Sequence, residues 1–138
     1  MKILIADDED YTREGLIESV PWGTYDIDEI MQAVNGLEAI KIAKWFRPDI
    51  VLTDVRMPKM DGIKFATEVL GLNPGCRIIF MSGYMEIEYL KSAIRLAAID
   101  YIEKPIDTDI LCKALQKAVD EIKSSRRNIE INERKKRK

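Results

Sequence analysis

The segment Asp49-Ile-Val-Leu-Thr-Asp54-Val-Arg-Met-Pro58-Lys-Met-Asp61-Gly62 decides the fold class of this chain. It contains the short apolar run Ile50 to Thr53, which is the kind of sequence that a strand buried in the centre of a parallel sheet requires. The run stops at a carboxylate, Asp54. Because ligands of open parallel sheets bind at the carboxyl ends of the strands, Asp54 is the first candidate for a functional residue.

Four further apolar runs and five helical patterns alternate with this strand. The expected strands are Lys2 to Ala6, Asp28 to Val34, Ile50 to Thr53, Arg77 to Met81 and Ile99 to Ile102. Apolar residues at three-to-four spacing predict amphipathic helices over Thr12 to Val20, Leu37 to Phe46, Ile63 to Leu70, Glu86 to Leu96 and Thr108 to Ile122. The alternation predicts an α/β fold of five βα units, (βα)5, and right-handed crossovers then place helices on both faces of a parallel sheet.

Turn-forming residues separate these elements where the pattern requires it. Asn35-Gly36 precedes the second helix, Pro48 the third strand, and Asn73-Pro74-Gly75 the fourth strand. Asp107 is the expected N-cap of the last helix.

The composition predicts one soluble domain and excludes several classes of site. A chain of 138 residues, 46% of them hydrophobic, can bury a core, and no run approaches the roughly 18 apolar residues of a membrane helix. We therefore expect a cytoplasmic protein without membrane contact. Cys76 and Cys112 form no C-x-x-C pattern and are expected to be reduced, buried structural thiols.

The absence of histidine argues against hydrolase triads and against most zinc sites. The remaining ligands for ions are oxygen atoms, which suit hard cations such as Mg²⁺. Any histidine that takes part in the mechanism must come from a partner.

Charge divides the chain near residue 122. Residues 1–122 carry 14 Lys and Arg against 22 Asp and Glu, whereas residues 123–138 carry 8 against 2. We interpret 1–122 as the domain and 123–138 as a basic linker, or a helix extension, that leads toward an output domain absent from this chain. A patch that binds nucleic acid directly is the less favoured interpretation of Arg126, Arg127 and the run Arg134 to Lys138.

Polar side chains follow the strands at the edge where a ligand would bind. They are Asp7, Asp8, Glu9 and Asp10 after the first strand, Asp54 after the third, Ser82 after the fourth, and Lys104-Pro105 after the fifth. Each alone has an ordinary explanation as a solvated loop, a cap or a turn. Together they form one group at one edge of the sheet.

This group has the chemistry of phosphoryl transfer. Clustered carboxylates repel one another, so the group requires a cation, and Mg²⁺ is commonly held by one or two carboxylates together with a phosphate. Lys104 supplies a second positive charge and Ser82 a hydroxyl donor. Asp54 lies between them as a carboxylate nucleophile, and an acyl phosphate is the implied intermediate.

Four segments together resemble the receiver domains of two-component response regulators. They are Asp7-Asp8, the segment 49–62, Met81-Ser82-Gly83-Tyr84, and Asp100-Tyr101-Ile102-Glu103-Lys104-Pro105. The resemblance covers residues 1 to about 122. It implies a flavodoxin-like doubly wound sandwich with a five-stranded parallel sheet in the order 2-1-3-4-5, which the doubly-wound fold class shares.

The resemblance also assigns a role to each residue. It implies that Asp54 is the phosphoacceptor and that Asp7, Asp8, Asp54 and the backbone carbonyl of Arg56 hold Mg²⁺. The remaining roles fall on Lys104 as the lysine of the site, Ser82 as the switch hydroxyl, Tyr101 as the rotating aromatic, Pro105 as the partner in a cis bond with Lys104, and Pro58 and Gly62 as residues that shape the loop. For Gly62 we expect a backbone angle that other residues resist.

The implied function is signalling. A sensor histidine kinase would supply the phosphoryl group, and the domain, although no enzyme in the usual sense, would promote its own phosphorylation and dephosphorylation. Phosphorylation would alter the face formed by the fourth helix, fifth strand and fifth helix and promote homodimerisation there. DNA would be reached only through an output domain.

The segments Arg13-Glu14-Gly15-Leu16, Pro21-Trp22 and Ser82-Gly83-Tyr84, with Tyr89, are most similar to receivers fused to a C-terminal AraC-type helix-turn-helix domain. Either a fragment of such a regulator or a natural single-domain receiver fits the chain. Ala97 departs from the glycine common at that position, at a cost of about 1 kcal/mol if the backbone there is left-handed.

Three other classes fit less well. An aspartyl-phosphate phosphatase would need a cap or substrate-binding region for which the chain leaves little room. A metal-free pseudo-receiver would lack one of the acidic residues, the acceptor or the lysine. A flavodoxin would need a phosphate-binding loop where this chain has four consecutive acidic residues, Asp7 to Asp10.

Overall fold

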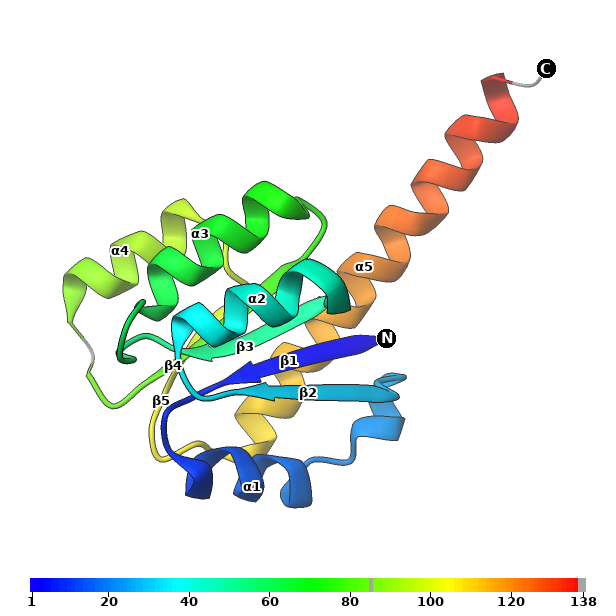
Figure 1. Cartoon of the computed structure of the whole chain (residues 1–138). Helices are drawn as coiled ribbons and strands as arrows, with labels where there is room; N and C mark the ends of the chain where they lie inside the picture. Colours follow the sequence, from blue (N-terminus) through cyan, green and yellow to red (C-terminus); the bar gives the residue numbers. More distant parts are fainter. Residues whose placement is uncertain (85, 137–138) are drawn as a thin grey trace.

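The computed structural model describes residues 1–84 and 86–136 and shows a parallel sheet between two layers of helices (Figure 1). The strands are β1 (Lys2–Ala6), β2 (Glu29–Ala33), β3 (Ile50–Asp54), β4 (Arg77–Ser82) and β5 (Asp100–Glu103). Their order is β2-β1-β3-β4-β5, with every neighbouring pair parallel. The predicted fold class and strand order are confirmed.

The helices match the predicted ranges to within a few residues, except at the end of the last one. They are α1 (Asp10–Ser19), α2 (Gly36–Phe46), α3 (Gly62–Leu72), α4 (Ile87–Arg95) and α5 (Thr108–Lys136). A short 3₁₀ helix, η1 (Trp22–Tyr25), was not predicted. Among the described residues no helix is long and apolar enough to cross a membrane.

Two hydrophobic cores lie on opposite faces of the sheet because side chains alternate along each strand. Ile3 and Ile5 of β1 face the core formed with α1 and α5, whereas Leu4 and Ala6 face the core formed with α2, α3 and α4. Every residue of β3 is buried, as its apolar sequence predicts for a central strand. The acceptor candidate therefore stands at the end of the most enclosed strand.

Side-chain caps fix the beginning of three helices. Asn35 accepts a hydrogen bond from the Glu38 amide and Asp61 one from the Lys64 amide, each at 2.8 Å. Asp107 accepts one from the Asp109 amide at 2.9 Å, which confirms it as the cap of α5.

The two thiols differ in burial. Cys76 is buried, and burial raises the pKa of its thiol to about 12, so it stays protonated. Cys112 is only partly buried at the margin of the α1/α5 core, because it lies on the side of α5 rather than on its inner face. The prediction of a buried thiol is wrong for Cys112.

α5 continues as one helix well past Ile122 and projects from the body as an arm (Figure 1). Ion pairs join its middle to the amino edge of the sheet: Lys123 with Asp26, and Arg126 with Asp49 at 2.6 Å. Asp49 also accepts a hydrogen bond from the Lys2 amide at 2.8 Å. The helix alternative for the basic segment is therefore the observed one. Arg137 and Lys138, which close the basic run, lie outside the described residues.

Ala97 ends α4 with φ of 54°, in the left-handed region. An L-residue with a Cβ is strained there, whereas glycine is not. Alanine at position 97, where glycine is common, therefore strains the backbone.

We expect Ala97→Gly to raise the free energy of unfolding by about 1 kcal/mol, because it removes this strain. Urea titration with an unchanged slope measures the gain. The neighbouring Ala98 is partly buried and has no positive φ, so Ala98→Gly is the matched control and should destabilise the protein. A loss of stability in Ala97→Gly would contradict the strain.

Candidate functional site

The carboxyl ends of four strands converge on one group of polar side chains. Asp7 follows β1, Asp54 ends β3, Ser82 ends β4 and Lys104 follows β5. Asp54 pairs in register with Met81, and Ser82 with Glu103, so the strand ends are level across the sheet. All four side chains are buried or nearly so.

Lys104 joins two carboxylates from distant parts of the chain. Its Nζ donates to Asp7 Oδ2 at 2.7 Å and to Asp54 Oδ2 at 3.1 Å, and Glu9 Oε1 lies 3.6 Å away. Asp7 has no exposed surface, and its Oδ1 accepts a hydrogen bond from the Glu9 amide at 2.9 Å. The sequence predicted the pair with Asp54, but not that Asp7 is the nearer partner.

The electrostatics of the site follow from burial and from this lysine. Burial raises the pKa of Asp54, and the charge of Lys104 only partly opposes the effect. Burial acts to lower the pKa of Lys104, but its hydrogen bond with Asp7 and the charge of Asp54 outweigh burial, so that this pKa is raised. Lys104 is therefore held as a cation, while Asp54 is a carboxylate whose charge is incompletely compensated.

Three carboxylates are arranged as a cation site would need. Oxygen atoms of Asp7, Asp8 and Asp54 all lie within 4.8 Å of one another. Ligand oxygens of one octahedral Mg²⁺, each about 2.1 Å from the ion, are separated by up to about 4.2 Å, which is a similar spacing. Burial and then the charge of Asp7 raise the pKa of Asp8, which is the electrostatic state that a cation relieves. The donor set fits Mg²⁺.

Arg13 supports Asp7 from α1, a contact that was not predicted although Arg13 belongs to the segment Arg13-Glu14-Gly15-Leu16 singled out by the resemblance. Although it lies in an amphipathic helix pattern, its side chain is buried. Its guanidinium donates to the Asp7 carbonyl, pairs with Asp10, and donates to Gln32 Oε1 at 3.1 Å. These contacts depend on the pairing of β1 with β2, which a reading of one segment cannot supply.

Ser82 and Tyr101 meet at the backbone of Tyr84. The Ser82 Oγ accepts from the Tyr84 amide at 2.9 Å and donates to the Tyr84 carbonyl at 3.0 Å. The Tyr101 hydroxyl donates to the same carbonyl at 3.0 Å. Ser82 and Tyr101, the two residues expected to act in a switch, therefore both form hydrogen bonds with the backbone of Tyr84.

Arg56 lies in the loop after β3, and its side chain reaches across to Tyr84 and the start of α4. The guanidinium carbon stands 4.0 Å from the centre of the Tyr84 ring. The nitrogens bond to Tyr89 Oη at 2.9 Å and to Glu86 Oε1 at 2.6 Å. These side-chain contacts were not predicted; the sequence singled out only the Arg56 carbonyl.

Three loop residues have the positions expected of them. The Lys104–Pro105 peptide bond is cis. Pro58 lies in the loop after β3 and Gly62 is the first residue of α3, at the end of that loop, but no described glycine has a positive φ, so the predicted reason for Gly62 is wrong. A Cβ on Gly62 would lie 1.9 Å from the Asp54 carbonyl oxygen, so close backbone approach requires the glycine.

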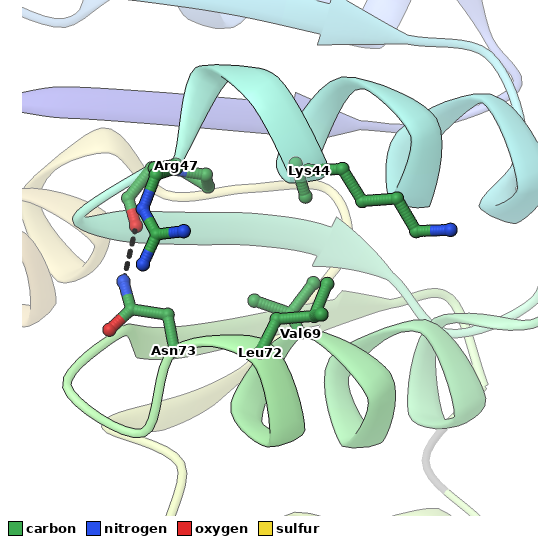
Figure 2. Close-up of a pocket in the computed structure, with 7 residues that line it drawn as sticks. Lys44, Arg47, Val69, Leu72 and Asn73 are labelled. Carbon is green, nitrogen blue, oxygen red and sulfur yellow. Dashed lines mark hydrogen bonds between the residues drawn. The ribbon is translucent and has the colours of Figure 1, made fainter.

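The described surface has a hollow at the site and another well away from it. The first is lined by Asp8, Glu9, Asp54, Arg56, Gly83, Tyr84 and Lys104. Figure 2 shows the second, between the last turns of α2 and α3, lined by Ala43, Lys44, Arg47, Pro48, Val69, Leu72 and Asn73. Its named lining contains no carboxylate, so it is no alternative to the acidic site.

Residues 3–116 match the family described as "Response regulator receiver domain". The chain belongs to that family. A receiver domain implies a histidine kinase as partner, and receivers bind Mg²⁺ at an acidic pocket.

Relatives of this receiver include transcription regulators. The transcriptional regulatory protein HptR of Staphylococcus aureus is 38% identical over 106 residues, which are 77% of this chain and 41% of HptR. A two component transcriptional regulator AraC from Clostridium phytofermentans is 44% identical, with a TM-score of 0.83 over 93% of this chain and 98% of that one. The REC domain of AraT from Geobacillus stearothermophilus is 35% identical, with a TM-score of 0.84 over 91% and 97%. The receiver spans less than half the length of the curated relatives.

We expect Gly62→Ala to destabilise the receiver by 2 kcal/mol or more, on the order of a strong steric clash in a packed site, because its methyl group would displace the Asp54 carbonyl. Gly71 is the matched control. It also lies in α3, and nothing lies within 4 Å of its added Cβ, so Gly71→Ala should be neutral or stabilising. Urea unfolding measures both; equal effects would refute the close approach.

The raised pKa of Asp54 predicts a pH-dependent stability of the metal-free receiver. The folded state holds this proton more tightly than the unfolded chain, whose Asp pKa is near 3.8, so the stabilisation is complete below that pH. It is lost as pH rises through the folded-state pKa. Asp54→Asn should therefore be more stable than wild type at pH 7 in EDTA, and the difference should shrink toward acid pH.

Urea unfolding from pH 3.5 to pH 7.5 tests this expectation, with the exposed Asp120→Asn as the charge-matched control. Addition of Mg²⁺ should stabilise the wild type and narrow the gap. A less stable Asp54→Asn at pH 7 would mean that the Lys104 ion pair outweighs burial.

Proposed function

We propose that this receiver is cytoplasmic, accepts a phosphoryl group on Asp54 from a sensor histidine kinase, and thereby switches a surface that controls transcription. The observation that carries the proposal is the position of Asp54 between Lys104 and the oxygens of Asp7 and Asp8 at the end of the central strand. The receiver itself has no histidine, so a phosphohistidine donor must lie outside this domain.

Asp54 acts as the nucleophile in this proposal. One of its oxygens attacks phosphorus, the bond from phosphorus to the donor nitrogen breaks, and the electron pair of that bond returns to the imidazole. Lys104 already contacts Asp54 and would contact an oxygen of the transferred group, with Asp7 holding the ammonium in place. Ser82 would supply a hydroxyl donor to another of those oxygens. Hydrolysis by water, at the same site, restores the carboxylate.

Mg²⁺, held by Asp7, Asp8, Asp54 and the carbonyl of Arg56, would neutralise negative charge on the transferring group when bound. The burial of Asp7 and Asp54 makes this neutralisation effective, since charges interact more strongly away from water. The receiver is thus no hydrolytic enzyme with a separate substrate. It promotes its own phosphorylation and dephosphorylation.

The switch would pass from Asp54 through Ser82 and Tyr101. When Ser82 turns toward the phosphoryl group it gives up its hydrogen bonds with Tyr84, and Tyr101 turns inward into the vacated space. The face of α4, β5 and α5 then changes and pairs with a second copy. Apolar side chains exposed along α4 support this surface: Ile87, Leu90 and Ile94.

The output is proposed to be an AraC-type DNA-binding domain in a longer protein, reached through α5. The similarity to a regulator of that type and the helical arm of residues 123–136 support this step. Residues 1–122 would be the receiver and 123–138 the connection.

Incubation with acetyl phosphate, followed by intact-mass measurement, tests the proposal. Wild type should gain one phosphoryl group in the presence of Mg²⁺, and EDTA should abolish the gain. Asp54→Asn should gain none, because it lacks the nucleophile. The exposed Asp120→Asn is the control for loss of a carboxylate and should label like wild type. Equal labelling of Asp54→Asn would refute the assignment of the acceptor.

A further inference from the structure

We propose that Arg56 is a positioning residue that latches Tyr84 and the start of α4 in the resting arrangement, and that phosphorylation of Asp54 releases this latch. The inference rests on the proposed function, since it concerns how that site reaches α4. It adds a second connection between Asp54 and α4, besides Ser82 and Tyr101, through a side chain in the loop that follows Asp54.

The contacts of Arg56 all cross from one loop to another element. The guanidinium carbon is 4.0 Å from the centre of the Tyr84 ring and 5.7 Å from that of Tyr89. Its nitrogens donate to Tyr89 Oη at 2.9 Å and to Glu86 Oε1 at 2.6 Å. A planar guanidinium can stack on a ring with its face while its edge donates hydrogen bonds, which a lysine cannot do.

Tyr84 is contacted by all three residues of the proposed switch and latch, Ser82, Tyr101 and Arg56. Its amide and carbonyl bond to Ser82 Oγ, its carbonyl also accepts from Tyr101 Oη, and its ring stacks under Arg56. If Ser82 turns toward a phosphoryl group on Asp54, Tyr84 loses both of its Ser82 bonds. The stack with Arg56 then remains as a restraint that opposes the rearrangement.

Arg56 lies close enough to Asp54 for a phosphoryl group there to weaken the contacts of Arg56 with Tyr84 and Glu86. It follows Asp54 by two residues, and both line the same hollow with Tyr84 and Lys104. A phosphoryl group on Asp54 brings negative charge into the hollow that Arg56 lines. The pair of Arg56 with Glu86 is half exposed and correspondingly weak, so a nearby dianion competes with it effectively.

Thermodynamic linkage then predicts whether loss of the latch raises or lowers the affinity for a phosphoryl analogue. A contact that exists only in the resting state lowers the apparent affinity for any ligand that requires the switched state, and removal of that contact raises the affinity by the same factor. For one exposed stack together with its hydrogen bonds we expect a factor of about five.

The test uses beryllofluoride with Mg²⁺ as a phosphoryl analogue on wild type, Arg56→Gln, Tyr84→Leu and the double variant. Arg56→Gln should bind the analogue about fivefold more tightly. Tyr84→Leu should bind it more tightly by a smaller factor, because it removes only the stack, and the double variant should bind it no more tightly than Arg56→Gln. Without the analogue, the amide resonances of Leu90 and Ala93 in α4 should move toward their positions in the bound wild type. Lys91→Gln is the control for the affinity measurement: its ion pair is with Glu88 in the same helix, so its affinity for the analogue should equal that of wild type.

The outcomes separate the latch from the proposed function. Failure of wild type to bind the analogue would refute the function, and the latch with it. Normal binding by wild type with an unaltered affinity and unaltered α4 resonances in Arg56→Gln would overturn the latch alone. Weaker binding by Arg56→Gln would also overturn it, because the attraction of Arg56 for the phosphoryl group would then outweigh any restraint that it exerts on Tyr84. A gain in affinity in Lys91→Gln equal to that in Arg56→Gln would reduce the effect to net charge.

Discussion

The bridge of Lys104 between two carboxylates is the interaction on which the rest of the structure depends. Lys104 is 97 positions from Asp7 and 50 from Asp54, yet its ammonium contacts both. Two carboxylates buried side by side would repel each other strongly without such a cation. The order of the sheet brings the ends of β1 and β3 next to each other and lets the turn after β5 reach them. The strand order of the fold thus determines which charges meet in the site.

Much of this arrangement could be predicted because its parts stand at positions that simple rules identify. Asp54 follows an apolar run, and Asp7, Ser82 and Lys104 follow other strands, so the parallel sheet alone brings them to one edge. The cap at Asp107 follows from side-chain chemistry in the same way, whereas Asn35 was predicted only as a turn residue and also caps α2. What was predicted correctly is what depends on local pattern and on sheet topology.

The remainder depends on contacts between side chains that no single segment contains. The burial of Arg13 requires the backbone of Asp7 and the amide of Gln32 to be in place. The cluster around Arg56 requires the turn after β3 to face the start of α4. Gly62 was singled out for the wrong reason, because a glycine is required there by the close approach of the Asp54 carbonyl of β3 and not by the φ angle of Gly62. In each case, what the sequence could not predict is the distance between residues from different segments of the chain.

The arm of α5 has a geometrical consequence for a chain that continues as the longer relatives do. The pair of Arg126 with Asp49 fixes the rotation of the helix about its axis, and Lys136 lies about 15 Å further along at the usual rise per residue. Each residue added to or removed from this arm would turn whatever follows by about 100° as well as move it along the axis. The number of residues in the arm therefore sets a rotational phase between the receiver and its continuation.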